Sequence, residues 1–269
     1  MIKLVASDMD GTLLDSNKNI NPEFYNVLED IKSRNMRFVA ISGRDLQSLK
    51  NVFSNVEDDI VLASNNGNLI SYRNEILYEN YIEKEKLLKV IPIIRKNAKH
   101  FTIYCSKDKI YSESILPSLI SRKWKLKINF VKDITKVDDN ILKVTTFGNQ
   151  NMINKAFKAV SILEDECMIT LSGKTCFDIC RLNGTKKQAI EILQKKFNIN
   201  YNETMVFGDH MNDLEMMESA YYSYAMENAK KEVKERARFI AKTNDENGVV
   251  EAIKEVALRN KQEALSTNA

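Results

Sequence analysis

Short apolar runs alternate with helical patterns towards both ends of the chain, and this alternation constrains the fold most strongly. Four such runs are mostly apolar, namely residues 2–6, 37–42, 60–63 and 204–207. A strand that reads as a continuous apolar run is buried on both faces, as the strands of a parallel sheet are. Helical patterns separate the runs, and the pair Asn21-Pro22 is typical of a helix start. We therefore predict an α/β protein with a parallel sheet that helices cover on both faces.

The middle of the chain has a different pattern, which predicts a separate insertion. Hairpin-like sequences occur there at residues 68–81, 101–112 and 167–180. The charge differs as well, because residues 82–184 hold 19 basic and 11 acidic side chains while the rest of the chain holds 21 and 26. We predict an α+β domain over residues 82–184, inserted into an α/β core that comprises residues 1–81 and 185–269.

The composition favours a folded cytosolic protein and argues against several kinds of site. Hydrophobic residues make up 43% of the 269 residues, which is enough for a substantial core. No apolar run reaches about 18 residues and no signal-like segment is present, so we expect a cytoplasmic protein without a membrane partner. The four cysteines and two histidines show no zinc-binding spacing. The net charge of +3 does not indicate a nucleic-acid partner.

Polar side chains follow the four predicted strands at the point where each strand ends. They form four groups, which are Asp8 and Asp10; Ser42, Gly43 and Arg44; Asn65 and Asn66; and Asp209, Asn212 and Asp213. Turn formation explains any one group, since Asp, Asn, Ser and Gly favour turns. Together they fit a ligand site better, because ligands of parallel α/β sheets bind at the carboxyl ends of the strands.

The aspartates at this edge predict a cation and a phosphate. Converging carboxylates repel each other unless a cation lies among them, and with no histidine or thiolate nearby the oxygen ligands select Mg²⁺. Mg²⁺ prefers a site that a substrate phosphate completes. A carboxylate that attacks a phosphate dianion meets a repulsion of about 4 kcal/mol per charge pair, which a metal and a lysine offset. A second acid is then needed to protonate the leaving oxygen and to activate water.

Four segments resemble the four motifs of the haloacid dehalogenase-like (HAD) phosphohydrolases. They are DMDGT at 8–12, the serine of ISGR at 41–44, a lysine after the insertion, and GDHMND at 208–213. The insertion lies between the second and third motifs, which is similar to the Cof-type branch, and the resemblance covers essentially the whole chain. It implies a Rossmann-like parallel sheet core (HAD fold) with an inserted α+β cap domain. It also implies a Mg²⁺-dependent phosphatase that acts on small phosphorylated metabolites, such as sugar phosphates, through an aspartyl-phosphate.

The resemblance also implies a role for each matching residue. Asp8 is then the nucleophile, and Asp10 is the general acid and base. Mg²⁺ is bound by Asp8, by the backbone carbonyl of Asp10 and by Asp209, and Asp213 supports it. The residues implied at the phosphoryl group or the rim of the pocket are Ser42, Gly43, Arg44, Asn66, Lys186 and Asn212.

Two of these assignments leave an alternative. The motif lysine is either Lys186 or Lys187 of GTKKQAI, and the following Ala189-Ile190 matches the end of the family pattern and favours Lys186. Lys187 then stands where the family has a glycine. Arg44 either lies at the rim of the pocket or pairs with an acidic side chain on the surface.

Two other functions are compatible with the sequence. A phosphomutase or phosphotransferase uses the same aspartyl-phosphate. The basic stretch at 122–127, with its tryptophan, suggests a nucleic-acid-binding protein, although a charge run is more often a solvated face. SGKT at 172–175 is not a P-loop, because Met168 stands where the first glycine is required. We therefore predict a phosphatase with no nucleic-acid partner, and the sequence indicates neither the particular metabolite nor the oligomeric state.

Overall fold

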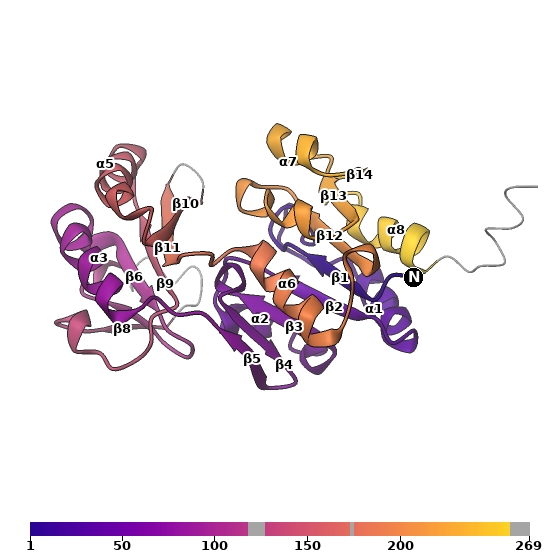
Figure 1. Cartoon of the computed structure of the whole chain (residues 1–269), viewed down its shortest axis with the longest axis horizontal. Helices are drawn as coiled ribbons and strands as arrows, with labels where there is room; N and C mark the ends of the chain where they lie inside the picture. Colours follow the sequence, from indigo (N-terminus) through magenta and orange to yellow (C-terminus); the bar gives the residue numbers. More distant parts are fainter. Residues whose placement is uncertain (118–126, 173–174, 259–269) are drawn as a thin grey trace, which may run out of the picture.

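The computed structural model describes residues 1–117, 127–172 and 175–258, which form two lobes with one β-sheet each (Figure 1). The first lobe comprises residues 1–79 and 186–258, and its sheet has the order β14-β13-β12-β1-β2-β3-β4-β5. The second lobe comprises the described residues between 84 and 181, and its sheet has the order β10-β11-β9-β6-β7-β8. The predicted boundaries fall in the two connections between the lobes, and the division into domains stays a prediction.

Most of the first sheet is parallel, as the apolar runs predicted. Its parallel strands are β1 (Leu4–Ser7), β2 (Arg37–Ile41), β3 (Ile60–Ser64), β12 (Thr204–Gly208), β13 (Tyr222–Met226) and β14 (Phe239–Ala241). Strands β4 (Leu69–Tyr72) and β5 (Glu75–Glu79) are antiparallel to their neighbours. The hairpin that the sequence pattern grouped with the middle of the chain thus extends the first sheet. The short turn between β3 and β4 explains this, because a parallel crossover needs a dozen or more residues.

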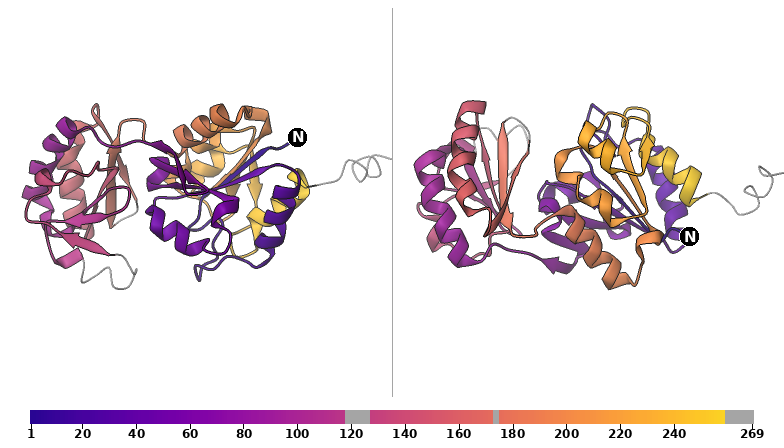
Figure 2. Two further views of the ribbon diagram at one scale, coloured as in Figure 1. Left: turned by 90° about the horizontal axis from the view of Figure 1, so that it is seen from below. Right: turned by 45° about the horizontal axis from the view of Figure 1, so that its top comes forward.

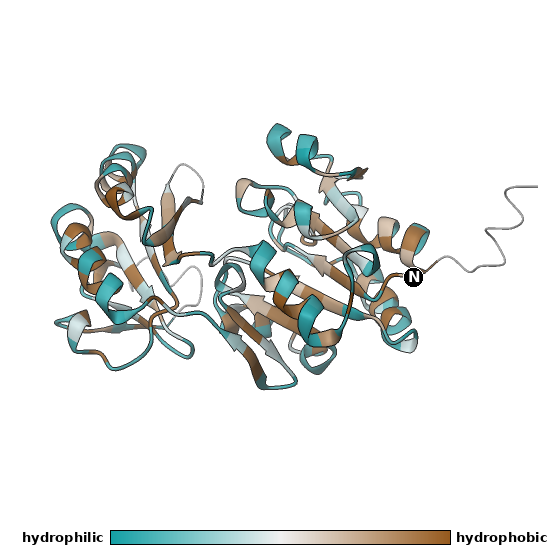
Figure 3. Ribbon diagram, viewed as in Figure 1, coloured by the Kyte–Doolittle hydropathy of each residue, from teal (hydrophilic) through white to brown (hydrophobic). Residues whose placement is uncertain are grey.

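Helices cover both faces of the first sheet, which confirms the predicted α/β class. They are α1 (Glu23–Ser33), α2 (Leu46–Val52), α6 (Lys186–Phe197), α7 (Lys231–Arg236) and α8 (Gly248–Ala252). Phe24 of α1, Leu49 of α2 and Val250 of α8 pack in one apolar cluster. Ile190 of α6 and Val233 of α7 pack in another, on the opposite face. The strands between the two layers are accordingly hydrophobic along most of their length (Figure 3).

In the described part of the second lobe, the α-helices cover one face of the sheet (Figure 2). Its strands are β6 (Thr102–Cys105), β7 (Ile110–Ser112), β8 (Ile128–Phe130), β9 (Lys143–Phe147), β10 (Cys167–Leu171) and β11 (Cys176–Arg181). Helices α3 (Lys84–Asn97) and α5 (Gln150–Val160) lie on the side away from the first lobe (Figure 2). Val90, Ile153 and Phe177 belong to the cluster beneath these helices. The other face of the sheet is directed towards the first lobe.

Short helical turns connect many of these elements. Two of them carry predicted site residues, namely η2 (Asn65–Gly67) after β3 and η8 (Met211–Asp213) after β12. The others are η1 (Glu57–Asp59), η3 (Lys99–Phe101), η5 (Ile134–Lys136), η6 (Ser161–Leu163), η7 (Tyr201–Glu203), η9 (Met216–Ser219) and the π-helical η10 (Ile253–Ala257).

Two sequence features fall largely outside the described residues. Of the basic stretch at 122–127 only Lys127 is described, and residues 173–174 of SGKT are likewise outside. Among the helices that the structure does describe, none combines the length and the apolar character needed to cross a bilayer.

Candidate active site

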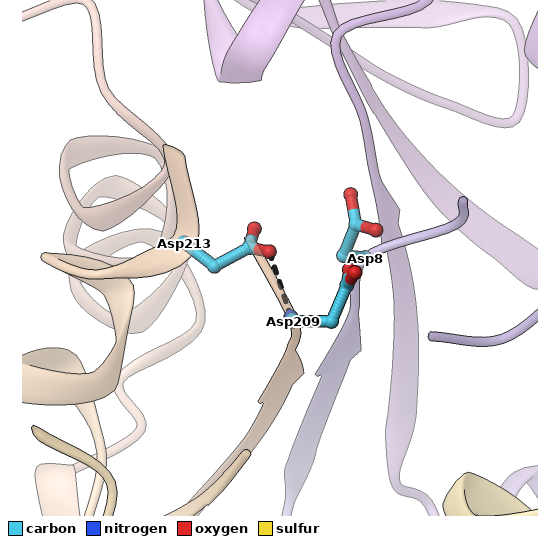
Figure 4. A group of neighbouring side chains, drawn as sticks. All are labelled: Asp8, Asp209 and Asp213. Carbon is cyan, nitrogen blue, oxygen red and sulfur yellow. Dashed lines mark hydrogen bonds between the residues drawn. The ribbon is translucent and has the colours of Figure 1, made fainter. Parts of the chain in front are cut away.

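Three aspartates meet at the carboxyl ends of two neighbouring strands. β1 and β12 are parallel with Ser7 opposite Phe207, so the residues that follow these strands lie side by side. Asp8 follows β1, Asp209 follows β12, and Asp213 ends the turn η8. One carboxylate oxygen from each lies within 4.8 Å of the others (Figure 4). The sequence predicted this convergence.

Lys186 is the lysine that reaches these carboxylates. It is the first residue of α6, its side chain is fully buried, and its Nζ donates to Asp8 Oδ1 and, at 2.5 Å, to Asp213 Oδ1. Lys187 points elsewhere and pairs with Glu218 at 2.9 Å on the surface. Of the two lysines that the sequence offered, Lys186 is the one in the site.

The electrostatics of this group call for additional positive charge. Burial raises the pKa of Asp8 to about 7, against the effect of Lys186 and together with that of Asp213 and Asp209. Burial also raises the pKa of Asp209, and Asp213 adds to this. Burial lowers the pKa of Lys186, but Asp213 and Asp8 outweigh it and hold that pKa above its ordinary value. One ammonium among three carboxylates leaves excess negative charge, which a divalent cation would neutralise.

The hydrogen bonds within the site leave room for such a cation. Asp213 Oδ2 accepts the backbone N–H groups of Asp209 and His210, both at 3.0 Å, and Asp209 Oδ1 accepts Thr12 Oγ1 at 3.0 Å. Asp8 Oδ2 and Asp209 Oδ2 accept no hydrogen bond from any residue that the structure describes. These two oxygens fit Mg²⁺, which takes one or two carboxylates and completes its shell with water and phosphate. Both oxygens of Asp213 already accept hydrogen bonds, so Asp213 holds Lys186 and the backbone of Asp209 in place.

A glycine makes space for the Asp209 carboxylate. Gly11 has a φ of +87°, and a Cβ atom at this position would meet Asp209 Oδ2 at 2.6 Å. A side chain here would therefore displace an oxygen that is free to bind a cation. The glycine of DMDGT has a structural reason to be there, because only glycine adopts this conformation readily.

Asp10 lies apart from the three clustered carboxylates. Arg44 donates two hydrogen bonds to the carboxylate of Asp10, from Nε to Oδ2 at 2.8 Å and from Nη2 to Oδ1 at 2.7 Å. Lys18 Nζ lies 3.0 Å from Oδ1. Burial opposes these cations, but Arg44 and Lys18 hold the pKa of Asp10 below its ordinary value. Arg44 thus pairs with Asp10, an acid of the predicted site, and its role at the rim of the pocket stays a prediction. Lys18 was not predicted, because its reach depends on the loop after the first motif.

The remaining predicted residues lie at the same edge of the sheet. Ser42 is buried, its Oγ accepts the N–H of Arg44 at 3.2 Å, and its carbonyl accepts the N–H of Asn66 at 2.8 Å. Asn66 Oδ1 in turn accepts Asn212 Nδ2 at 3.2 Å, which joins the third strand end to the fourth. The carbonyl of Gly43 accepts Lys143 Nζ from the second lobe at 2.6 Å. Lys143 is a contact that the sequence reasoning missed.

Two of the cavities between the lobes are lined by predicted site residues. The larger, of about 540 Å³, is lined by Asp10, Arg44 and Lys18 from the first lobe and by Lys143 and Ile103, among others, from the second. The smaller, of about 110 Å³, is lined by residues that include Asn66, Lys186, Asn212 and Asp178. A further cavity of about 650 Å³, next to α8, contains none of the predicted site residues. Five of the predicted side chains therefore line these two cavities, namely Asp10, Arg44, Asn66, Lys186 and Asn212.

Comparisons with known proteins agree with this arrangement. A relative from Escherichia coli (strain K12), the 5-amino-6-(5-phospho-D-ribitylamino)uracil phosphatase YbjI, is 26% identical over 260 residues, which cover 95% of this chain and 96% of the relative. The crystal structure of SMU.1108c from Streptococcus mutans UA159 has a TM-score of 0.86 at 27% identity and covers 96% of this chain and 100% of that chain. A structure described as the HAD subclass IIB sugar phosphatase BT4131 shares the fold, with a TM-score of 0.80 at 21% identity over 96% of this chain and 100% of that chain.

The family assignment follows from a match that spans nearly the whole chain. Residues 5–253 match the sequence model of the haloacid dehalogenase-like hydrolases, a range that contains every predicted site residue and both lobes. The resemblance stated from the four motifs is confirmed, and with it the Rossmann-like core and the hydrolase class. The chain belongs to the haloacid dehalogenase-like hydrolases.

Proposed function

We propose that the protein is a Mg²⁺-dependent phosphatase that hydrolyses small phosphate monoesters through an aspartyl-phosphate on Asp8. The observation that carries this proposal is the buried group of Asp8, Lys186 and Asp213 beside Asp209, at the carboxyl edge of a parallel sheet. Two of the similar proteins are named as phosphatases, one of a ribitylaminouracil phosphate and one of sugars. Small phosphorylated metabolites are the substrate class that fits both names.

Asp8 attacks the phosphorus atom of the ester in the first step. A bond forms between a carboxylate oxygen of Asp8 and phosphorus, and the bond from phosphorus to the ester oxygen breaks. The leaving oxygen takes a proton from Asp10. Lys186 favours the ionised form of Asp8 and fixes its orientation. Bound Mg²⁺, held by Asp8 and Asp209, supplies positive charge against the repulsion between carboxylate and phosphate.

Water then hydrolyses the aspartyl-phosphate. Asp10 removes a proton from the attacking water as the water oxygen bonds to phosphorus. The bond between Asp8 and phosphorus breaks, which restores the Asp8 carboxylate, and inorganic phosphate leaves. Hydrogen-bond donors for the phosphoryl oxygens are available from Ser42, Asn66 and Asn212, which lie together at the strand ends. These neutral donors stabilise the charge that develops on the transferred group.

Arg44 and Lys18 give Asp10 a way to exchange its proton. They hold Asp10 ionised in the free protein, since both cations contact its carboxylate. A phosphate dianion that enters the cavity competes for the same cations and weakens their effect on Asp10. The pKa of Asp10 then rises, and the carboxyl takes up the proton that the leaving oxygen needs.

Replacement of Asp8 tests the covalent mechanism. Asp8→Asn is nearly isosteric, but an amide is a poor nucleophile, so we expect kcat for p-nitrophenyl phosphate to fall by about 10³-fold or more. Asp15→Asn serves as the control, because Asp15 accepts backbone N–H groups of the neighbouring loop and touches none of the site carboxylates. Activity of Asp8→Asn above a few per cent of the wild type would contradict the mechanism. Transfer of the phosphoryl group to a second alcohol, without release of phosphate, would instead indicate a phosphotransferase.

A further inference from the structure

The face of the second sheet that looks towards the first lobe carries one charged pair. Side chains alternate along each strand, so Val144 and Phe177 pack beneath the helices while Lys143 and Asp178 face the other way. Both charged side chains are only 8% exposed. Thr145 lies directly opposite Asp178 in the pairing of β9 with β11.

Stability of the lobe does not explain this pair. Lys143 Nζ lies 3.8 Å from Asp178 Oδ1, which is too far for a hydrogen bond. A buried ion pair with imperfect geometry does not recover the free energy lost on desolvating its two charges. Apolar side chains at the same two positions would stabilise the lobe at least as well. The pair therefore calls for a ligand-binding explanation.

The two groups retain hydrogen-bonding capacity. An ammonium has three protons, and among the described residues Lys143 Nζ donates one hydrogen bond, to Gly43 O at 2.6 Å. Asp178 accepts Thr145 Oγ1 at 2.6 Å on Oδ1 and Ser172 Oγ at 3.0 Å on Oδ2, out of about four lone-pair sites. A ligand group that accepts a hydrogen bond from Lys143 and donates one to Asp178 would use the remaining hydrogen-bonding capacity of both side chains.

The pair stands where a substrate has to pass. Lys143 lines the larger cavity together with Asp10, which is the proposed acid. Asp178 lines the smaller cavity together with Lys186, which contacts the proposed nucleophile. An ester bond that is cleaved between Asp8 and Asp10 therefore has its leaving group beneath Lys143 and Asp178.

We propose that Lys143 and Asp178 together bind a hydroxyl group of the leaving alcohol and so select polyhydroxylated phosphate esters, such as sugar or alditol phosphates. This inference rests on the proposed function, whose phosphoryl site it extends to the leaving group. A carboxylate is repelled by Asp178 and an ammonium by Lys143, whereas a hydroxyl both accepts and donates. Phosphate esters of simple or aryl alcohols have no such hydroxyl, so they form no hydrogen bond with Lys143 or Asp178.

The experiment compares two classes of ester in wild type, Lys143→Met and Asp178→Asn. With the best polyol phosphate from a panel of sugar and alditol phosphates, we expect Lys143→Met to lower kcat/KM by about 10- to 100-fold, and Asp178→Asn to lower it in the same direction. With p-nitrophenyl phosphate both variants should lose much less kcat/KM than with the polyol phosphate, because that ester makes no hydrogen bond to the pair. Removal of the recognised hydroxyl from the substrate should lower kcat/KM of the wild type and leave kcat/KM of Lys143→Met unchanged.

Thr146→Val is the matched control. Thr146 lies on the same strand β9, but its Oγ1 is hydrogen-bonded to Thr102 at 2.9 Å on the side of the sheet that the helices cover. Loss of this hydroxyl should therefore change kcat/KM equally for both ester classes. If Lys143→Met does not fold, Lys143→Gln and Asp178→Asn take its place in the same comparison.

Three outcomes distinguish this inference from the proposed function. Equal losses of kcat/KM in the two variants on polyol and aryl phosphates would overturn the inference and leave the phosphatase assignment intact. The same follows if deoxygenation and Lys143→Met reduce kcat/KM independently, because the two changes would then act on separate contacts. A wild type that is inactive towards every ester, including p-nitrophenyl phosphate, would overturn the proposed function and this inference with it.

Discussion

Adjacent lysines at the start of α6 point in different directions, which decides which of them takes part in chemistry. Successive residues of an α-helix are turned by about 100°, so Lys186 faces the carboxylates when Lys187 faces solvent and Glu218. We expect Lys186→Met to lower kcat by about 10²- to 10³-fold, since it removes the cation that contacts the nucleophile. Steady-state kinetics with p-nitrophenyl phosphate measures this.

Lys187→Met is the control for that substitution. It removes the same charge one residue away, and it breaks only an exposed ion pair, so we expect kcat within about twofold of the wild type. A larger loss in Lys187→Met than in Lys186→Met would contradict the placement of these two side chains.

The sequence predicted some residue contacts better than others. The convergence of Asp8, Asp209 and Asp213 followed from their places at the ends of strands, because parallel strands bring such residues to one edge. The pairing of Arg44 with Asp10 was not predicted, because several partners lie within reach of a long side chain. The role of Lys143 had no sequence signal, since a single charge inside a strand pattern reads as a solvated position.

At the scale of elements, the loop after β1 shows how a turn shapes the candidate metal site. Gly11 combines a φ of +87° with a gap of only 2.6 Å between its ideal Cβ position and Asp209 Oδ2. Gly11→Ala should displace Asp209 and weaken Mg²⁺ binding by about 10- to 100-fold, as other changes around metal ligands do. Titration of activity with Mg²⁺ measures the change.

Gly148→Ala is the matched glycine substitution. Gly148 lies in the second lobe, and a Cβ there meets the end of the flexible Met152 side chain, which can move aside. Its Mg²⁺ dependence should equal that of the wild type. Equal Mg²⁺ affinity in Gly11→Ala would show that Asp209 does not bind the ion as proposed.

A second element-scale prediction concerns acid stability of the second lobe. Hydrogen bonds from Thr135 and Arg95 lower the pKa of Asp133 to about 2. A lowered pKa stabilises the folded state above the ordinary value of 3.8, and this contribution is lost as the pH falls towards 2. Urea unfolding should therefore show Asp133→Asn as less stable than the wild type at pH 6 and equally stable near pH 2. An equal difference at both pH values would contradict this account.

Element types were easier to predict than the sheet to which each element belongs. Apolar runs identified the parallel strands, because a strand that is buried on both faces is hydrophobic at nearly every position. The sequence pattern of the β4–β5 hairpin is like that of the middle of the chain, although the predicted boundary at residue 81 left it with the core and it pairs with β3. Alternating strands of this kind fit the edge of either sheet, and only the short turn after β3 decides between them.

At the scale of the whole molecule, charge is divided between the segments that form the lobes. Residues 82–184 hold 19 basic and 11 acidic side chains, and the rest of the chain, which includes the site aspartates, holds 21 and 26. The field of the second lobe should draw anionic esters towards the inter-lobe cavities. We expect kcat/KM to fall as salt rises from about 0.01 to 0.15 M, because the screening length drops from about 30 to 8 Å.

The same measurement contains its own control. Steering acts on encounter, so kcat at saturating substrate should change much less with salt than kcat/KM. A flat profile of kcat/KM would show that the basic lobe does not attract substrate.

The strand order of the first sheet has a consequence for synthesis on the ribosome. β1, which carries Asp8 at its end, is made well before its neighbour β12, which follows only after the whole second lobe. The second lobe is continuous in sequence and can form while the first is still missing its centre. Asp8, the proposed nucleophile, thus leaves the ribosome long before its partner and has to wait for Asp209, some two hundred residues later, before the site around it exists.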